Sequence, residues 1–495
     1  MSILGAMKWR HLVLVFAVAQ VACAQTEETI SLTLRECIER ALANNLDISV
    51  ERINPKIESG AILSAQGDFD PSLSLDMRYR EVQTPLFSVQ TNSAANTTRN
   101  TFLTPGLTGK LPTGTSYDFS YNGTEQQTSP DLNDEHRAAW TVGLTQPLLR
   151  DFGLGPNLAN LRIARKNKQI AIYTLVAKVT DTIREVHNAY YDLIFAIENL
   201  KVQKESLELA NALLAENKKR LEVGMMSPLD VTQAESGVAS QEEAVIQAQQ
   251  DIRVQSNRLR RLISSNVAPL RQTRIVPVDT PSVEPVHVHV EQSIQRGIGN
   301  RPEYQLQKQA IERENIQLRF DRNQLFPQVD VTGSYGQSGL ASWRGGALDS
   351  AFTTSEFPEW TVGVVVEIPL GNLTARGNYR ASKLRAQQAV LQLKSIEQDI
   401  IVEVDNAAAQ VQTNLKRIEA TGAARRLAEE TLNAERKRLE AGTSTSYTVL
   451  QHQRDLTDAR SKEIRAIADY NESLATLYRA EGTLLEKNHV TVKED

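Results

Sequence analysis

Apolar residues recur every seven positions along three stretches of the chain. The first stretch contains Val186, Leu193, Leu200, Leu207, Leu214 and Leu221. The second contains Val404, Val411, Ile418, Arg425, Leu432 and Leu439, in which Arg425 is the one charged member. The third contains Val231, Val238, Val245, Ile252 and Leu259. Sustained heptads without an internal proline predict long helices with coiled-coil packing. The helix expected over residues 158–221 would be about 95 Å long at 1.5 Å per residue.

The first two heptad runs end in nearly the same way. The segment RLEVGMMSPLDV begins at Arg220, and RLEAGTSTSYTV begins at Arg438. A glycine follows the last heptad leucine by three residues in each, at the position where a left-handed C-cap belongs. Ser227 followed by proline is a typical restart of a helix. Each break is therefore interpreted as the tip of a long helical hairpin.

Between the helical stretches lie segments in which apolar and polar residues alternate, which is typical of strands. Alternating apolar positions are Leu73, Leu75, Met77 and Tyr79; Tyr117, Phe119 and Tyr121; Trp140, Val142 and Leu144; and Trp360, Val362, Val364 and Val366. The tryptophans are expected to open their strands, at an aromatic girdle. Strands of a soluble sandwich would alternate in the same way, so this pattern alone leaves both interpretations open.

The two halves of the chain resemble each other in this order of segments. WTVGLTQPLL at 140–149 matches WTVGVVVEIPL at 360–370, and the first half has 36 more residues between Pro71 and Trp140. We therefore expect a first structural repeat over 25–266, a proline-rich linker over 267–290 and a second repeat over 291–495.

The N-terminus has the pattern of a secretory signal peptide over residues 1–24, with a basic start, an apolar run and a small-residue cleavage site. Acylation of Cys23, as in a lipoprotein, is the alternative. The full chain has a formal net charge of −5, and the mature part is more acidic still because Lys8 and Arg10 are removed. This balance does not favour nucleic acid. Cys37 is the one cysteine left, which excludes an intramolecular disulfide.

No motif of catalysis, nucleotide binding or metal binding stands out, so we expect no enzyme activity, no cofactor and no metal. His287 and His289 would share one face of a strand, but no third ligand is near them in the sequence. A linker that crosses the surface is the better interpretation of this pair.

Taken together, NRPEY at 300–304, FPQVDVTGSY at 326–335, LTQPLLRDFG at 144–153 and the two breaks resemble the TolC-like outer-membrane efflux protein family. The resemblance covers nearly all of the mature chain. It implies a mostly α-helical protein with membrane β-structure: a homotrimer in which each chain adds four strands to a twelve-stranded outer-membrane β-barrel. Antiparallel helical hairpins would form a periplasmic α-barrel, whose tips face a periplasmic adaptor protein and an inner-membrane pump.

The resemblance also assigns roles to residues. The tips that contact the adaptor would include Arg220, Gly224, Met226, Asp230, Arg438, Gly442 and Ser444. The periplasmic aperture would be lined by Asp230, Thr448 and Gln451, and the outer-membrane lipid would contact Leu73, Leu75, Met77, Tyr79, Trp140, Trp360, Val362 and Val364. Arg220 and Arg438 could instead cap the helix C-termini that they precede.

Two features depart from the family pattern. Thr448 and Gln451 stand where the family often has acidic residues, which argues against strong cation selectivity at the aperture. The extra residues of the first half contain a second hairpin pattern over 106–122, which would raise the count to six strands per chain if it joined the barrel. The leading hypothesis is a passive exit duct of a tripartite efflux pump or a type I secretion system. The alternative is a non-transporting coiled-coil protein of the periplasm or cell envelope.

Overall fold

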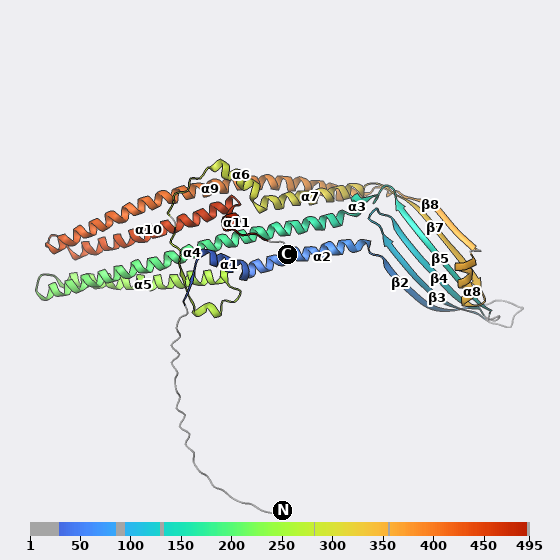
Figure 1. Cartoon of the computed structure of the whole chain (residues 1–495), viewed down its shortest axis with the longest axis horizontal. Coiled ribbons are helices and arrows are strands. Elements are labelled where there is room, and N and C mark those ends of the chain that lie inside the picture. The colour runs from blue at the N-terminus through green and yellow to red at the C-terminus, as the bar shows by residue number, and fades with distance from the viewer. Residues whose placement is uncertain (1–28, 86–94, 129–132, 282, 355–356, 493–495) are drawn as a thin grey trace, which may run out of the picture.

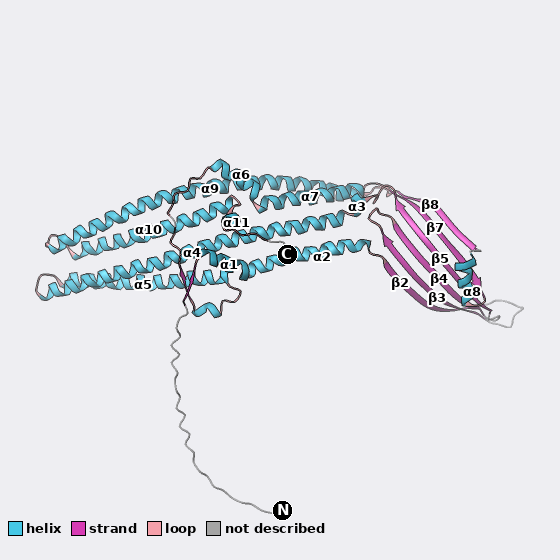
Figure 2. Cartoon of the chain, in the orientation of Figure 1, coloured by secondary structure: helices cyan, strands magenta, loops and turns pink. Residues whose placement is uncertain are grey.

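The computed structural model describes residues 29–85, 95–128, 133–281, 283–354 and 357–492, and the expected signal peptide with Cys23 lies outside these ranges. The molecule is elongated, with helices side by side along most of its length and a sheet at one end (Figure 1, Figure 2). None of the helices in the described ranges is both long enough and apolar enough to cross a membrane.

Two helices run along nearly the whole helical part. α4 (Ala159–Glu222) has 64 residues and α9 (Leu373–Glu440) has 68, which corresponds to about 96 and 102 Å. The chain turns back at the end of each of them, into α5 (Pro228–Ile263) and α10 (Ser446–Ala480). The helix expected over 158–221 is therefore confirmed, with both turns where the glycines placed them.

The helices form a layer in which each helix contacts its neighbours. Toward the tips the order is α5, α4, α10, α9, and toward the sheet it is α2 (Leu46–Gln66), α4, α7 (Pro302–Asn323), α9. The remaining α-helices are α1 (Leu34–Asn44), α3 (Leu154–Asn157), α6 (Val290–Asn300), α8 (Arg344–Asp349) and α11 (Leu484–Lys487). Three single-turn helices complete the helical structure: η1 (Gly67–Phe69), η2 (Pro269–Gln272) and the π-helix η3 (Ser350–Thr354).

Six strands form one antiparallel sheet in the order β2-β3-β4-β5-β7-β8. Their bounds are β2 (Ser72–Pro85), β3 (Ala95–Lys110), β4 (Ser116–Thr128), β5 (Asn133–Pro147), β7 (Gln328–Ala341) and β8 (Phe357–Glu367). A separate parallel pair, β1 (Thr29–Leu32) with β6 (Arg274–Pro277), lies beside the helices. β2 and β8 are the two edges of the large sheet.

The sheet corrects two expectations. The resemblance implied four strands per chain, but the extra residues of the first half form β3 and β4 in the middle of the sheet, so the chain has six strands in it. Trp140 does not open its strand, because β5 begins at Asn133 and pairs with β4 from its first residue. Backbone pairing continues past the end of the apolar alternation, which is why the side-chain pattern underestimated the strand. Trp360 lies near the start of β8, as expected.

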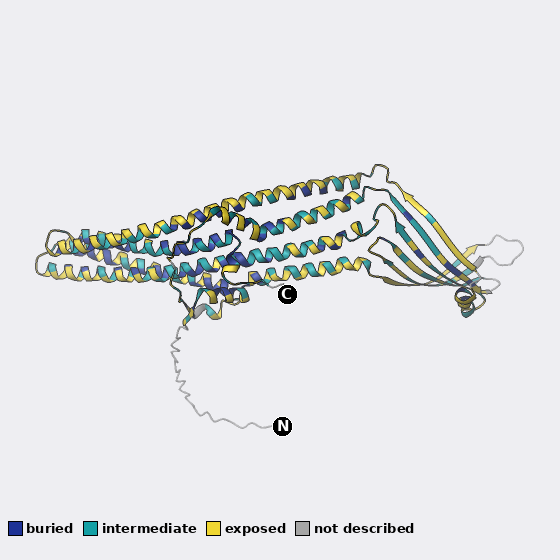
Figure 3. Ribbon diagram, turned by 45° about the horizontal axis from the view of Figure 1, so that its top comes forward, coloured by how far each residue is buried: buried dark blue, intermediate teal, exposed yellow. Residues whose placement is uncertain are grey.

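Buried and exposed residues alternate along the long helices (Figure 3). Burial follows the heptads only in part. On α5 the heptad valines are buried, but on α4 the leucines after Leu193 are only half-buried. The buried positions of that part of α4 are Ala196, Val202, Ser206, Ala210, Leu213 and Asn217. α4 lies between α5 and α10 in a layer, so it buries its two flanks instead of a single seam. Of the α4 heptad, Val186 and Leu193 are buried, so the expected coiled-coil packing along the whole run is wrong for the leucines after them.

Each half of the chain passes through helices, strands, a long helix and a returning helix in the same order, although the first half carries more strands. The stretch expected to be a linker, 267–290, contains η2 and β6 as well as extended residues. The boundaries at 25–266, 267–290 and 291–495, and the two-fold repeat itself, stay predictions.

Candidate functional site

One face of the large sheet carries an apolar band that crosses all six strands. Directly opposed residues of neighbouring strands point to the same face, and one such row reads Leu73, Leu107, Phe119, Val142, Tyr335 and Trp360. The candidate lipid contacts on the two edge strands belong to this face and are exposed in the single chain: Leu73, Leu75, Met77, Tyr79, Trp360, Val362 and Val364. Contact of these side chains with lipid stays a prediction.

The opposite face is polar. The adjacent register row reads Ser72, Thr108, Asp118, Gly143, Ser334 and Thr361. Close to it, Arg78 donates a 2.6 Å hydrogen bond from Nε to Oδ1 of Asp76, and both side chains are exposed. A sheet with one apolar and one polar face can separate lipid from water once its edges are paired.

A short helical segment covers the far end of the apolar face. η3 packs on Trp140, whose indole N–H donates a 2.9 Å hydrogen bond to the carbonyl of Ala351. The ring of Phe352 stacks on Trp140 with the centroids 6.1 Å apart and on Tyr121 at 6.2 Å. Trp140 therefore belongs to the expected apolar face but is half-buried by this segment, which the sequence pattern did not predict.

Both tips end in the same backbone motif. Gly224 and Gly442 have φ values of 74° and 73°, which confirms the left-handed conformation expected from the sequence. The amides of Met225 and Thr443 bond to the carbonyls of Arg220 and Arg438 at 2.8 Å, closing a Schellman motif in each tip. The hairpins therefore turn in the same way.

The two tips are also tied to each other. Arg220 donates a 3.2 Å hydrogen bond from Nη1 to the carbonyl of Leu439, at the end of the other long helix. Ser446 donates a 3.0 Å hydrogen bond to Oδ1 of Asn217, and both residues are fully buried. Arg220 thus caps a helix of the neighbouring hairpin instead of its own. Arg438 pairs with Glu435 at 3.0 Å. Its side chain binds no carbonyl of the described residues, so the capping expectation is wrong for it.

Four of the exposed side chains at the tips are large and apolar. Val223, Met225 and Leu229 of the first tip are 68%, 79% and 65% exposed, and Tyr447 of the second is 59% exposed. Sequence reasoning chose Met226 instead, but this side chain is half-buried with its sulfur 3.8 Å from the hydroxyl of Ser446. Periodicity did not distinguish the two neighbouring methionines, because the tip is not helical.

Ser444 and the expected aperture residues are also held in local hydrogen bonds. Ser444 donates a 2.8 Å bond to Glu435. The carboxylate of Asp230 accepts bonds from the amide and hydroxyl of Ser227, which makes it part of a capping box. The amide of Thr448 bonds to the cap residue of α10, and Gln451 donates a 3.1 Å bond to Asp455. Asp455, one turn beyond Gln451, is an exposed acid of the second hairpin that the sequence comparison of the two tips missed.

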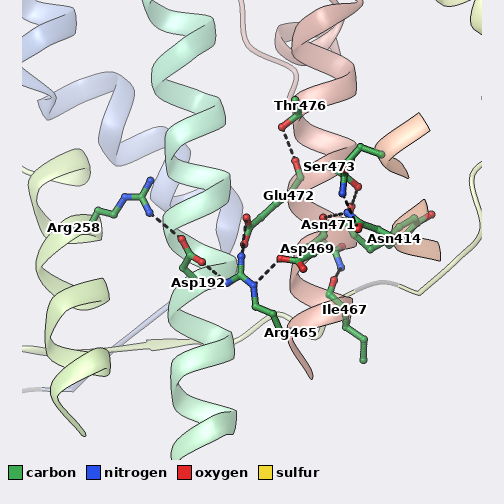
Figure 4. Close-up of polar contacts among 12 residues, drawn as sticks. Asp192, Arg258, Asn414, Arg465, Ile467, Asp469, Asn471, Glu472, Ser473 and Thr476 are labelled. Carbon is green, nitrogen blue, oxygen red and sulfur yellow. Dashed lines mark hydrogen bonds and ion pairs between the residues drawn. The ribbon is translucent and has the colours of Figure 1, made fainter. Parts of the chain in front are cut away.

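A cluster of charged residues joins α4, α5 and α10 farther from the tips (Figure 4). Asp192 binds Arg258 at 2.9 Å and Arg465 at 2.7 Å, and Arg465 also binds Asp469 at 2.7 Å. The carboxylate of Glu472 lies 3.4 Å from the same guanidinium. Burial, and then the charge of Asp192, raises the pKa of Glu472 above its ordinary value. The cluster is well suited to hold the three helices in register.

The NRPEY motif forms a joint between helices. Arg301 lies between α6 and α7, as the C-cap residue of α6 and the N-cap residue of α7. Its buried guanidinium binds Glu303 at 3.2 Å and Glu403 of α9 at 2.5 Å. Tyr304 donates a 3.0 Å hydrogen bond to Glu397, also of α9. The motif therefore serves the packing of the helical layer. In the described part of the chain, no group of three or more His, Cys, Asp or Glu side chains could hold a metal ion.

Solved structures share this fold. The outer membrane protein VceC from Vibrio cholerae has a TM-score of 0.67 and 20% sequence identity, with 91% of this chain and 96% of that chain covered. The CmeC outer membrane channel of Campylobacter jejuni has a TM-score of 0.68 and 15% identity, with 98% and 94% covered. At these identities the similarity is one of fold.

Sequence comparison supports the same relationship. Nodulation protein T of Rhizobium leguminosarum bv. trifolii is 25% identical over 189 residues, and the match spans only 38% of that protein and 38% of this chain. A model described as outer membrane efflux protein matches residues 37–265 and 293–483, which is most of both halves. The chain therefore belongs to the outer membrane efflux protein family.

Proposed function

We propose that this outer-membrane protein is the passive exit duct of a tripartite efflux pump or a type I secretion system, working as a homotrimer. The observation that supports this proposal most is that one chain contains both a two-faced sheet and very long helices. A sheet with one apolar face and two unpaired edges continues into helices of about 100 Å that end in two adjacent tips. The helical part would extend into the periplasm.

The two lateral edges of the chain are arranged so that copies of it can associate side by side into a closed ring. α2 leads through η1 into the edge strand β2, and the other edge strand, β8, leads into α9 (Figure 1). Each lateral edge is thus a strand and a helix in series. A head-to-tail contact between unlike edges closes into a ring when the rotation allows it, and it would satisfy both unpaired strands at once.

The lateral helices carry apolar stripes that such a contact would cover. On α2 the exposed residues Leu46, Val50, Ile53 and Ile57 follow the spacing of one helix face. On α9 the exposed residues Leu384, Leu391 and Val402 do the same. Apolar surface at both edges favours permanent association of copies over a free single chain.

The apolar residues at the tips are suited to contact a periplasmic adaptor. Val223, Met225, Leu229 and Tyr447 are exposed apolar side chains at the end of the molecule farthest from the sheet. An inner-membrane pump would supply the energy for transport, since the chain contains no phosphate-binding loop. The family is one of efflux proteins, not of enzymes.

The alternative, a structural coiled-coil protein that transports nothing, would leave the apolar face of the sheet in water. Fractionation separates the two functions directly. We expect the mature protein in outer-membrane fractions, soluble only with detergent and migrating as a trimer. Recovery as a soluble periplasmic monomer would contradict the duct.

Site-directed crosslinking tests the orientation and the adaptor. Met225→Cys and Tyr447→Cys should capture a periplasmic protein in intact cells, because both side chains project from the tips. Val254→Cys is the matched control: it is 50% exposed on α5 but far from the tip, and it should capture much less. Reaction of the tip cysteines with a membrane-impermeant reagent added outside intact cells would show that the proposed orientation is wrong.

A further inference from the structure

The extra hairpin β3–β4 is a full part of the sheet. β3 pairs with β2 from Ser72 opposite Thr108 to Pro85 opposite Ala95, along the whole of β2. β4 pairs with β5 along its whole length as well. An accessory loop folded onto a four-stranded sheet would lie at an edge or on a face, whereas these strands separate β2 from β5.

The hairpin also continues both faces of the sheet. Phe119 lies in the apolar row that runs from Leu73 to Trp360, and the next residue, Ser120, points to the polar side with Asp118. The register shows no inversion between the strands of the hairpin and their neighbours. β3 and β4 therefore have the same two-sided character as the rest of the sheet.

The positions of two aromatic residues allow the tilt of the strands relative to the barrel axis to be calculated. Tyr79 lies six positions beyond Leu73, the residue of β2 that shares a register row with Trp360 of β8. If both rings mark one membrane boundary, the register shifts by six residues over the five steps from β2 to β8. At about 3.3 Å per residue and 4.8 Å per strand this is a tilt of about 40°, inside the 35–45° range of membrane barrels.

We infer that the hairpin widens the outer-membrane part of the duct, which three copies would close with eighteen strands instead of twelve. This inference rests on the trimeric duct proposed above. At a tilt of about 40° the backbone diameter would be about 36 Å for eighteen strands and about 24 Å for twelve. Barrels of 16–18 strands enclose an aqueous channel.

The described residues leave this lumen open, since the helical segment between β7 and β8 packs on the apolar face at Trp140 and not on the polar face. The lumen of the barrel itself would then be wide enough for hydrophilic cargo such as an unfolded polypeptide. The narrowest point of the duct would lie in its helical part.

Paired cysteines test the position of the hairpin in the intact chain. In trimers reconstituted into vesicles, Ser120→Cys should react with a charged maleimide on the order of tenfold faster than Phe119→Cys, because the two residues face water and lipid respectively. The native Cys37 is fully buried, and burial raises the pKa of its thiol to about 12, so it gives little background. Equal rates at 119 and 120 would overturn the inference.

Excision of residues 95–132 tests the width. β2 and β5 are antiparallel to each other, so the shortened chain can pair them directly and form a four-stranded sheet. Polyethylene glycols added on the barrel side should enter the parent channel up to a size that the shortened channel excludes, with the limiting diameter reduced by at least about a third. An unchanged limit would overturn the inference.

If the shortened chain does not assemble, the cysteine pair decides alone. The two proposals also fail separately. A parent chain that forms no detergent-requiring trimer contradicts the duct itself, whereas trimers with equal labelling of the two cysteines contradict only the wider barrel.

Discussion

Replacing Leu75 with arginine tests the apolar face most directly. Leu75 lies on β2 with its side chain 63% exposed in the single chain, and it is four residues from Tyr79. At about 3.3 Å per residue and a tilt of about 40°, it would lie about 10 Å inside the boundary that the tyrosine marks. The apolar band of such barrels is about 25 Å tall, so this position is close to its middle.

The expected cost follows from that depth. An arginine on the lipid face near the midplane costs about 2–4 kcal/mol, which is a factor of about 30 to 1,000 in the folding equilibrium of each copy. The matched control is Asp76→Arg, one residue farther along the strand and on the polar face. The pair that it loses, Asp76 with Arg78, is exposed on both sides and is worth less than about 1 kcal/mol.

The assay is a urea titration of protein folded into lipid vesicles, with the folded fraction read from the trimer band on a gel without heating. We expect Leu75→Arg to lower the midpoint strongly and Asp76→Arg to leave it almost unchanged. Equal losses in the two variants, or no loss in either, would refute the assignment of the two faces.

Three further predictions concern the helices. Leu432→Asp should lower the melting temperature much more than Leu207→Asp, because Leu432 is 2% exposed and Leu207 only half-buried; similar melts would contradict the burial pattern. Gly224→Val and Gly442→Val should each lower the free energy of unfolding by only about 1–2 kcal/mol, the cost of a left-handed valine, since a Cβ there meets no atom within 4 Å. Crosslinking of the tips to the adaptor should nevertheless fall clearly. Burial and nearby acidic charge raise the pKa of Glu472, so its proton stabilises the folded state at acidic pH, and this stabilisation is lost as pH rises through the raised pKa. From pH 5 to 9, the melting temperature of Glu472→Gln should therefore decline less than that of the parent. An equal decline in the two proteins would exclude this carboxyl as the cause.

The helical part was largely predictable because its signals are local. A heptad run and a glycine three residues after its last leucine fix both the length of α4 and the position of its tip, and the structure places Gly224 as expected. The contacts between the tips were not predictable. Arg220 binds the carbonyl of Leu439, 219 residues away in sequence. A short local sequence pattern does not identify a partner so far away.

The strands were predictable in type and face but not in number or length. Alternation assigned Leu75 and Val364 to one face, and the register places them on one apolar face of the sheet. It could not decide whether the hairpin around Phe119 would pair with β2 and β5, because pairing depends on backbone partners far away in the sequence. The polar ends of the strands were missed for a similar reason, since backbone hydrogen bonds continue where the side-chain alternation has stopped.

In this molecule, the exposed fraction of a residue in the single chain is a poor guide to whether a substitution at that residue is tolerated. A layer of helices and an open sheet have no inner side that is shielded from solvent, so copies and lipid must cover much of what a compact core would bury. Leu73 is 81% exposed and Leu391 is 64% exposed in one copy, yet a charge at either position should be harmful if lipid covers the first and a neighbouring copy covers the second. Asp76 is a counter-example on the same strand, because water should remain on its side of the sheet after assembly. The sensitivity of a residue should therefore follow the face on which it lies in the assembled ring, and its exposure in the isolated chain should matter little.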